Sequence, residues 1–174
     1  MTPIALVLIV LILAASFVGA LYIFHQTERE RMANEFRLNS IERVLPNKMQ
    51  AYERMALYLD RISPMNMVQR EQMKVQTAFD LYPLLSNAVR QEFEHNVAMQ
   101  IYFPTKTWVK IERARDEVQK CLTDEAKAID KRASSIEYGM QVVDSAKNGC
   151  QFHIDRALEA LRHDIGDAMV IPNL

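Results

Sequence analysis

The sequence is poor in the residues that build turns, cross-links and metal sites. Its 174 residues include only four Gly, six Pro, two Cys and one Trp. Scarce Gly and Pro disfavour a turn-rich β fold and favour long helices. The two cysteines, Cys121 and Cys150, are too few for a disulfide framework and lack the spacing of zinc ligands. We therefore expect reduced, partly buried thiols, which suit the cytoplasm.

An excess of charge of either sign is also absent. Lys and Arg number 21 against 22 Asp and Glu, which gives a formal net charge of -1. Without a strongly basic face, nucleic-acid binding is not expected. The chain also lacks a Gly-rich phosphate loop, a nucleophile elbow and a zinc-ligand pattern. The sequence therefore predicts neither an enzyme nor a bound cofactor.

The sequence does contain one long apolar stretch, Ile4 to Phe24, in which Ser16 is the only polar interruption. As a helix it would be roughly 31 Å long, enough to cross the ~30 Å hydrocarbon core of a bilayer. A signal peptide would need a basic start, a shorter apolar run and a small-residue cleavage site. Here residues 1–3 carry no Lys or Arg, and bulky residues follow the small Gly19-Ala20 pair. An uncleaved transmembrane anchor over residues 1–24 is the better interpretation.

The charged residues around this anchor predict its orientation. None of the Lys or Arg residues precedes it, whereas five follow closely: Arg29, Arg31, Arg37, Arg43 and Lys48. The positive-inside rule then places the N-terminus outside and the C-terminal body in the cytoplasm, at a bacterial inner membrane. Acidic residues interleave with these cations, which argues against a polybasic lipid-binding patch.

Small residues mark one face of the anchor. Close approach of helix backbones through small residues is a main source of affinity between helices in lipid. A single anchor has no partner helix within its own chain, so this face predicts homo-oligomers. The predicted helix–helix contact consists of Ala15, Ser16, Gly19 and Ala20.

The rest of the chain is expected to be all-α. The pattern predicts a helical stalk over 25–45, a helical cytoplasmic domain over 46–168 and an apolar tail over 169–174. Pro46 is expected to end the stalk and open a helix, Pro83 to open another, and Asn148-Gly149 to stop a third. The expected helices are 46–62, 83–102, about 105–147 and about 150–167; the pattern over 65–82 leaves helix and connector open.

The longest of these helices carries apolar residues at heptad spacing. One interpretation is an elongated bundle in which the two earlier helices pack along it. The other is a coiled coil between chains. The predicted bundle seam comprises Trp108, Ile111, Val118, Leu122, Ile129, Ile136 and Val143.

Two groups of residues carry a family resemblance. One is Glu92-Phe93-Glu94-His95-Asn96 with Gln100-Ile101-Tyr102 and Trp108; the other is Gln50-Ala51-Tyr52-Glu53-Arg54 with Arg61-Ile62-Ser63-Pro64. They resemble a family of small, uncharacterised single-pass membrane proteins of Bacteroidota with a helical cytoplasmic body. The resemblance implies the architecture and a bacterial inner membrane, and it implies no chemistry.

Glu92-x-x-His95 is the one chemical motif, because Glu-x-x-His on a bundle helix is half of a ferritin-like dimetal signature. No second copy exists, and Glu159 and His163 lie four apart, so a metal-binding bundle enzyme is only a remote alternative. The sequence best predicts a membrane-anchored scaffold that self-associates and presents a helical body. The alternative is an accessory subunit of a larger envelope complex for secretion, motility or transport. Membrane lipid, further copies and other membrane-complex subunits are the expected partners.

Overall fold

The computed structural model describes residues 3–130, 132–147 and 149–169, except the side chains of 3–10, 13–15, 30, 33–34, 36–43 and 168–169. This part of the chain is helical and contains no strand, as the sequence predicts. Its elements are α1 (Pro3–Arg61), α2 (Pro64–Glu71), the 3-10 helix η1 (Gln72–Lys74), α3 (Ala78–Asn96), the 3-10 helix η2 (Val97–Tyr102), α4 (Thr105–Ala128), α5 (Ser135–Lys147) and α6 (Cys150–Met169).

The chain divides into two units, residues 1–47 and residues 48–174. The first unit consists of the N-terminal part of α1. No helix within the described residues is both long and apolar enough to span a membrane. For the expected anchor, the side chains of residues 4–10 and 13–15 lie outside the described ones.

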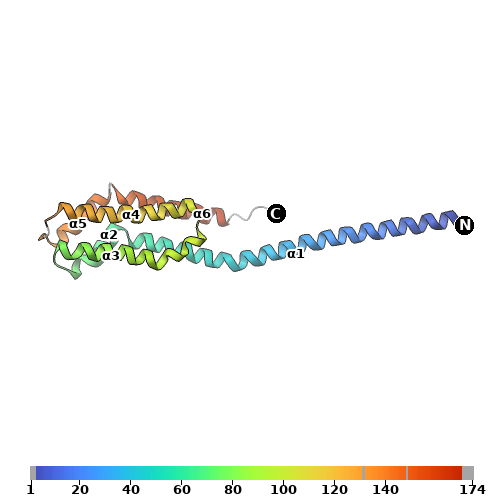
Figure 1. Ribbon diagram of the computed structural model, residues 1–174, viewed down its shortest axis with the longest axis horizontal. Helices are drawn as coiled ribbons and strands as arrows, with labels where there is room; N and C mark the ends of the chain where they lie inside the picture. Colours follow the sequence, from blue (N-terminus) through green and yellow to red (C-terminus); the bar gives the residue numbers. More distant parts are fainter. Residues whose placement is uncertain (1–2, 131, 148, 170–174) are drawn as a thin grey trace. The chain divides into compact units, whose positions relative to one another are not determined.

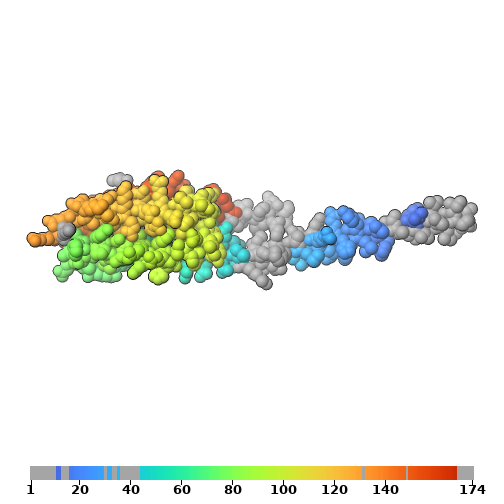
Figure 2. All heavy atoms as spheres, viewed as in Figure 1, coloured from blue at the N-terminus to red at the C-terminus, as the bar shows by residue number. Residues whose placement is uncertain are grey.

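The second unit, which we call the body, is a bundle of helices (Figure 1). Its first segment in the chain is the end of α1 together with α2, and its last segment is α5 together with α6. Between them lie α3 and α4, which run side by side in Figure 2 and pack against each other. Helix α4 also packs against α5 and α6. The intramolecular bundle is therefore the arrangement within the body. Its largest fully buried side chains include Tyr52, Met55, Tyr58, Leu59, Leu81, Leu85, Ile111, Leu122, Tyr138 and Ile154.

The first and last segments each contain a break between two helices. Residues beside the two breaks contact each other. Ile62 and Ser63 separate α1 from α2, and Pro64 is the first residue of α2, where a missing N–H costs little. The Ser63 hydroxyl donates a hydrogen bond of 3.3 Å to Oε1 of Gln151, just after the start of α6.

Two prolines do not have the effect that the sequence pattern predicts. Pro46 lies inside α1 and opens no new helix, and Pro83 lies inside α3. Helix α3 begins instead at Ala78, because the Thr77 hydroxyl accepts a hydrogen bond of 3.2 Å from the Asp80 N–H and caps the first turn. Pro83 therefore falls in the second turn. A proline removes one hydrogen bond from a helix interior, and the rest of a packed helix can carry that cost.

The expected long helix over 105–147 is wrong, because α4 ends at Ala128 and α5 begins at Ser135. The backbone turns extended at Ile129, and a capping box starts the next helix, α5. The Glu137 N–H donates to Ser134 Oγ at 3.2 Å, and the Ser134 N–H donates to Glu137 Oε2 at 2.8 Å. Ser134-x-x-Glu137 is a local sequence pattern for a helix start, and the heptad spacing obscured it.

Hydrogen bonds from another part of the chain hold this turn in place. The Ser135 N–H donates to the Gln76 carbonyl at 2.8 Å, and the Ala78 N–H donates to the Ala133 carbonyl at 2.9 Å. The Ser135 hydroxyl adds a bond of 2.8 Å to the Val75 carbonyl. The segment over 65–82 thus combines α2, η1, a short extended link and the start of α3. The end of the predicted tail, residues 170–174, lies outside the described residues.

Candidate functional site

The predicted bundle seam is buried on α4 and interrupted beyond it. Trp108 is 8% exposed, and Ile111, Val118 and Leu122 are fully buried. Ile129 and Val143 are partly buried and pack against the same core.

Ile136 is 50% exposed, so its assignment to the seam is wrong. The cause is the turn after α4, which resets the helical phase that a continuous heptad would have kept. Helix α5 consequently buries a different face, which includes Tyr138, Gly139 and Val142.

The predicted contact face of the anchor can be placed in part. Ser16, Gly19 and Ala20 are exposed on α1, and the Ala15 side chain lies outside the described ones. The Ser16 hydroxyl donates a hydrogen bond of 2.8 Å to the Ile12 carbonyl, so it is satisfied within its own helix. A Cβ added at Gly19 would meet no atom within 4 Å.

Glu92 and His95 line a polar groove of about 420 Å³ between α2 and α3. Glu92 forms an ion pair of 3.2 Å with Arg61, and His95 is exposed. In the same groove the buried Glu71 accepts hydrogen bonds from Lys74 at 2.7 Å and Arg70 at 3.0 Å. Burial alone would raise the pKa of Glu71, but these cations outweigh it and lower the pKa. The carboxylates here are engaged by cations of the chain itself.

A second polar cluster surrounds Asp164, whose carboxylate is buried between α6 and α4. The buried Thr107 hydroxyl donates a hydrogen bond of 2.5 Å to Asp164 Oδ2, and Lys106 Nζ lies 3.9 Å from Oδ1. Burial, and then the charge of Asp164, raise the pKa of Tyr52 to about 12. The hydroxyls of Tyr52 and Tyr58 are buried without a hydrogen-bond partner among the described residues.

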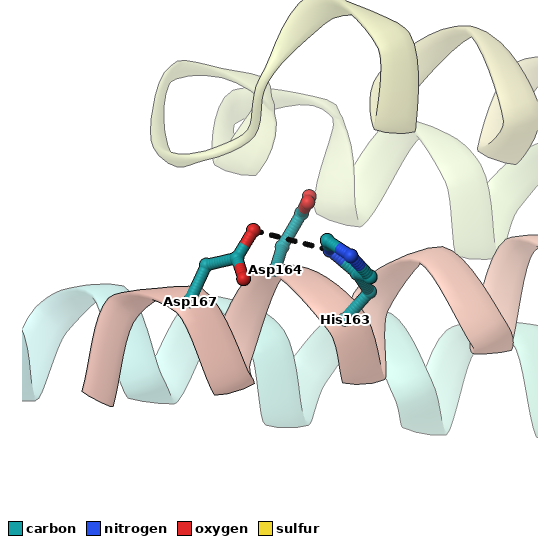
Figure 3. A group of neighbouring side chains, drawn as sticks. All are labelled: His163, Asp164 and Asp167. Atoms are coloured by element: carbon teal, nitrogen blue, oxygen red, sulfur yellow. Dashed lines mark ion pairs between the residues drawn. The ribbon is translucent and has the colours of Figure 1, made fainter. Parts of the chain in front are cut away.

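Asp164 has His163 and Asp167 as neighbours on α6, and one ligand atom from each lies within 4.8 Å of the others. Figure 3 shows His163 and Asp167 facing each other, with 3.1 Å between Nδ1 and Oδ2, while Asp164 projects away from α6. The two facing side chains are about two-thirds exposed, and the hollow beside Asp164 is also lined by Lys106 and Lys110. The positive charges of these lysines disfavour the binding of a metal ion. The cluster is better explained as a surface ion pair beside a buried hydrogen bond.

The Thr107–Asp164 hydrogen bond gives a stability prediction. Thr107→Val keeps the shape of the side chain and removes the donor, which leaves a buried carboxylate short of one partner. We expect the free energy of unfolding to fall by about 1–3 kcal/mol in urea unfolding followed by Trp fluorescence. Lys106→Met is the control, because the Lys106 side chain is 68% exposed and its Nζ lies 3.9 Å from the carboxylate, so we expect its removal to cost no more than about 1 kcal/mol. Equal effects of the two changes would contradict the assignment.

The body also carries an apolar groove of about 440 Å³, which is the candidate interaction site. It lies between the start of α3 and the end of α4, where the Tyr82 hydroxyl is 3.3 Å from the Thr123 hydroxyl. Phe79 stands at the groove with 65% of its surface exposed. The full lining is Ala78, Phe79, Tyr82, Pro83, Thr123, Ala126, Lys127 and Ile129. Such a surface can accept apolar side chains. Sequence reasoning missed it because it expected α3 to begin at Pro83 and α4 to continue past Ala128.

Comparison with known proteins assigns the chain to a family. A family model matches residues 1–168. The chain belongs to DUF7935, a family of unknown function. No curated protein and no solved structure matches it significantly.

Proposed function

We propose that this DUF7935 protein is a single-pass membrane scaffold that self-associates through its anchor and presents its helical body to other proteins. The observation that carries the proposal is the run of exposed apolar side chains on the first part of α1. Eight large ones are between 45% and 71% exposed: Leu11, Ile12, Phe17, Val18, Leu21, Tyr22, Ile23 and Phe24.

Exposure on this scale requires a covering surface. Burying one large apolar side chain is worth about 1.5–3 kcal/mol relative to leaving it in water. These side chains follow one another along a helix, and the apolar run Ile4–Phe24 contains no charge. Hydrocarbon would cover such a helix on all sides, and lipid together with a second copy would do the same. The bacterial inner membrane, with the N-terminus outside and the body in the cytoplasm, fits the cations that follow the run.

An accessory subunit of a larger envelope complex is the second candidate. The apolar groove between α3 and α4 favours it, because a body that only spaced copies apart would not need an exposed Phe79 beside a hollow lined by Tyr82 and Ile129. Both candidates assign binding rather than chemistry to the body. They differ in whether copies of the chain associate alone.

Insertion into lipid nanodiscs followed by mass measurement tests the scaffold. We expect the wild-type chain to insert and to give a multiple of its 20.1 kDa mass. Gly19→Ile places bulk on the small-residue face and should reduce that multiple, because close backbone approach is lost. The helicity of the body should not change.

Leu21→Ala is the matched control, since it lies about 200° around the helix from Gly19 and should keep the wild-type mass. A chain that stays in the aqueous phase would refute the anchor. A Gly19→Ile chain that keeps its full oligomeric mass would place the contact elsewhere, and a monomeric wild type would favour the accessory subunit.

A further inference from the structure

The apolar groove of the body has room for a large side chain from outside. It lies between the start of α3 and the end of α4, two helices that Figure 2 shows side by side on one face of the body. Its volume is about 440 Å³, whereas an enclosed cavity of roughly 150 Å³ is enough to hold a benzene molecule. The groove can therefore accept an aromatic ring.

Phe79 supplies such a ring on the same surface. It lines the groove at the start of α3, and 65% of its surface is exposed. A protruding apolar side chain beside an apolar hollow makes a surface that is complementary to itself. A two-fold axis between two copies would place Phe79 of each copy over the groove of the other, so that the same residues supply both sides of the contact.

The charges around the groove are also suited to a second copy. Lys127 carries the one charge among the described lining residues, and its Nζ lies 4.0 Å from Asp124 Oδ1 in an exposed ion pair. Asp80 and Asp130 each follow a lining residue directly and are exposed. A partner with charge of one sign would meet a like charge here, whereas a second copy can set its Lys127 against an acidic residue of the first.

We propose that the groove is a contact between two copies of this chain, in which Phe79 of each copy fills the groove of the other. The proposal rests on the membrane scaffold proposed above. The groove lies the same number of residues from the anchor in every copy, so copies in one membrane can bring their grooves together.

Anchoring also explains how so small a contact can suffice. A stable dimer of free proteins buries roughly 800 Å² on each partner, which is more than one groove provides. Two chains that already associate through their anchors hold their bodies at a high effective concentration, and a weak second contact then forms readily. We therefore expect the groove contact to depend on the membrane and to strengthen the association of the anchors.

Photo-cross-linking of the full-length protein in lipid vesicles tests the contact. A photoreactive benzoylphenylalanine placed at Phe79 should give a covalent dimer of twice the 20.1 kDa mass in vesicles that hold only this chain. In a mixture of isotope-labelled and unlabelled chains, peptide mapping should join position 79 of one copy to the end of α4 in the other. Phe152 is the matched control position, because it is also a phenylalanine, is 60% exposed and lies on α6. The same probe at Phe152 should give no dimer.

Substitution of the same two residues measures the strength of the contact. Phe79→Glu should lower the association constant of the chains in the membrane at least about tenfold, because burial of one large apolar side chain is worth that much. Energy transfer between donor-labelled and acceptor-labelled full-length chains, followed over the lipid-to-protein ratio, gives this constant. Phe152→Glu should leave it unchanged. Both side chains are exposed, so neither change should alter the helicity of the body or its unfolding in urea.

The outcomes separate this contact from the proposed function. Chains that associate in the membrane without a cross-link from position 79, or with equal cross-linking from positions 79 and 152, would overturn the groove contact and leave the scaffold standing. Chains that stay monomeric in the membrane would overturn both. In cell membranes, an adduct of position 79 with another protein in place of the dimer would also overturn the contact, and it would favour the accessory subunit.

Discussion

Leu122→Ala is expected to lower the free energy of unfolding of the body by about 2–5 kcal/mol, the usual cost of a cavity in a packed core. Leu122 is fully buried on α4. Its carbonyl also accepts a hydrogen bond of 2.8 Å from the buried Tyr138 hydroxyl, so any backbone shift around the cavity would disturb a second contact. The measurement is urea unfolding followed by the fluorescence of Trp108, the only tryptophan, which is 8% exposed in the body.

Ile136→Ala is the matched control for this cavity. The heptad pattern gives the two positions the same role, but Ile136 is 50% exposed at the start of α5. Its truncation opens no enclosed cavity, and Ala is the better helix former, so the change should stay below about 1 kcal/mol. A loss at Ile136 equal to that at Leu122 would support one continuous helix over 105–147 and contradict the break.

Gly139→Ala is expected to destabilise the body by about 1–3 kcal/mol, although Ala is normally the better residue in a helix. Gly139 lies inside α5, where α5 packs directly on α2. A Cβ there would come within 2.6 Å of Val68 Cγ1 and 3.0 Å of Gln72 Oε1. Gln72 can move its flexible end away, but Val68 is short, branched and 4% exposed, so the helices themselves would have to separate.

Gly166→Ala provides a control of opposite sign. Gly166 lies inside α6, is exposed, and has no atom within 4 Å of an added Cβ. Ala should therefore stabilise the protein by about 0.5–1 kcal/mol, through its higher helix propensity and a less flexible unfolded chain. The same urea titration measures both variants. If both glycine substitutions stabilise the body, then α2 and α5 do not pack as closely as described.

The sequence by itself determined the fold class and several element ends. Scarce Gly and Pro and apolar residues at helical spacing predicted an all-helical chain, because these properties act within a few residues. For the same reason the expected helix end at residue 62 and the expected starts at residues 105 and 150 lie within one residue of the end of α1 and the starts of α4 and α6. The buried residues of α4 were found because their spacing is regular over a single uninterrupted helix.

Tertiary structure determined where the helix predicted by the heptad pattern is interrupted. It also determined which side chains contact each other. The heptad spacing continued through residues 129–134, where the structure instead starts a new helix with the Ser134–Glu137 capping box. Hydrogen bonds that Ser135 donates to the carbonyls of Val75 and Gln76 hold that start in place. The apolar groove and the Thr107–Asp164 hydrogen bond each join different helices. No local pattern encodes such contacts, because they depend on how the helices of the bundle align. The packing of the whole core determines that alignment.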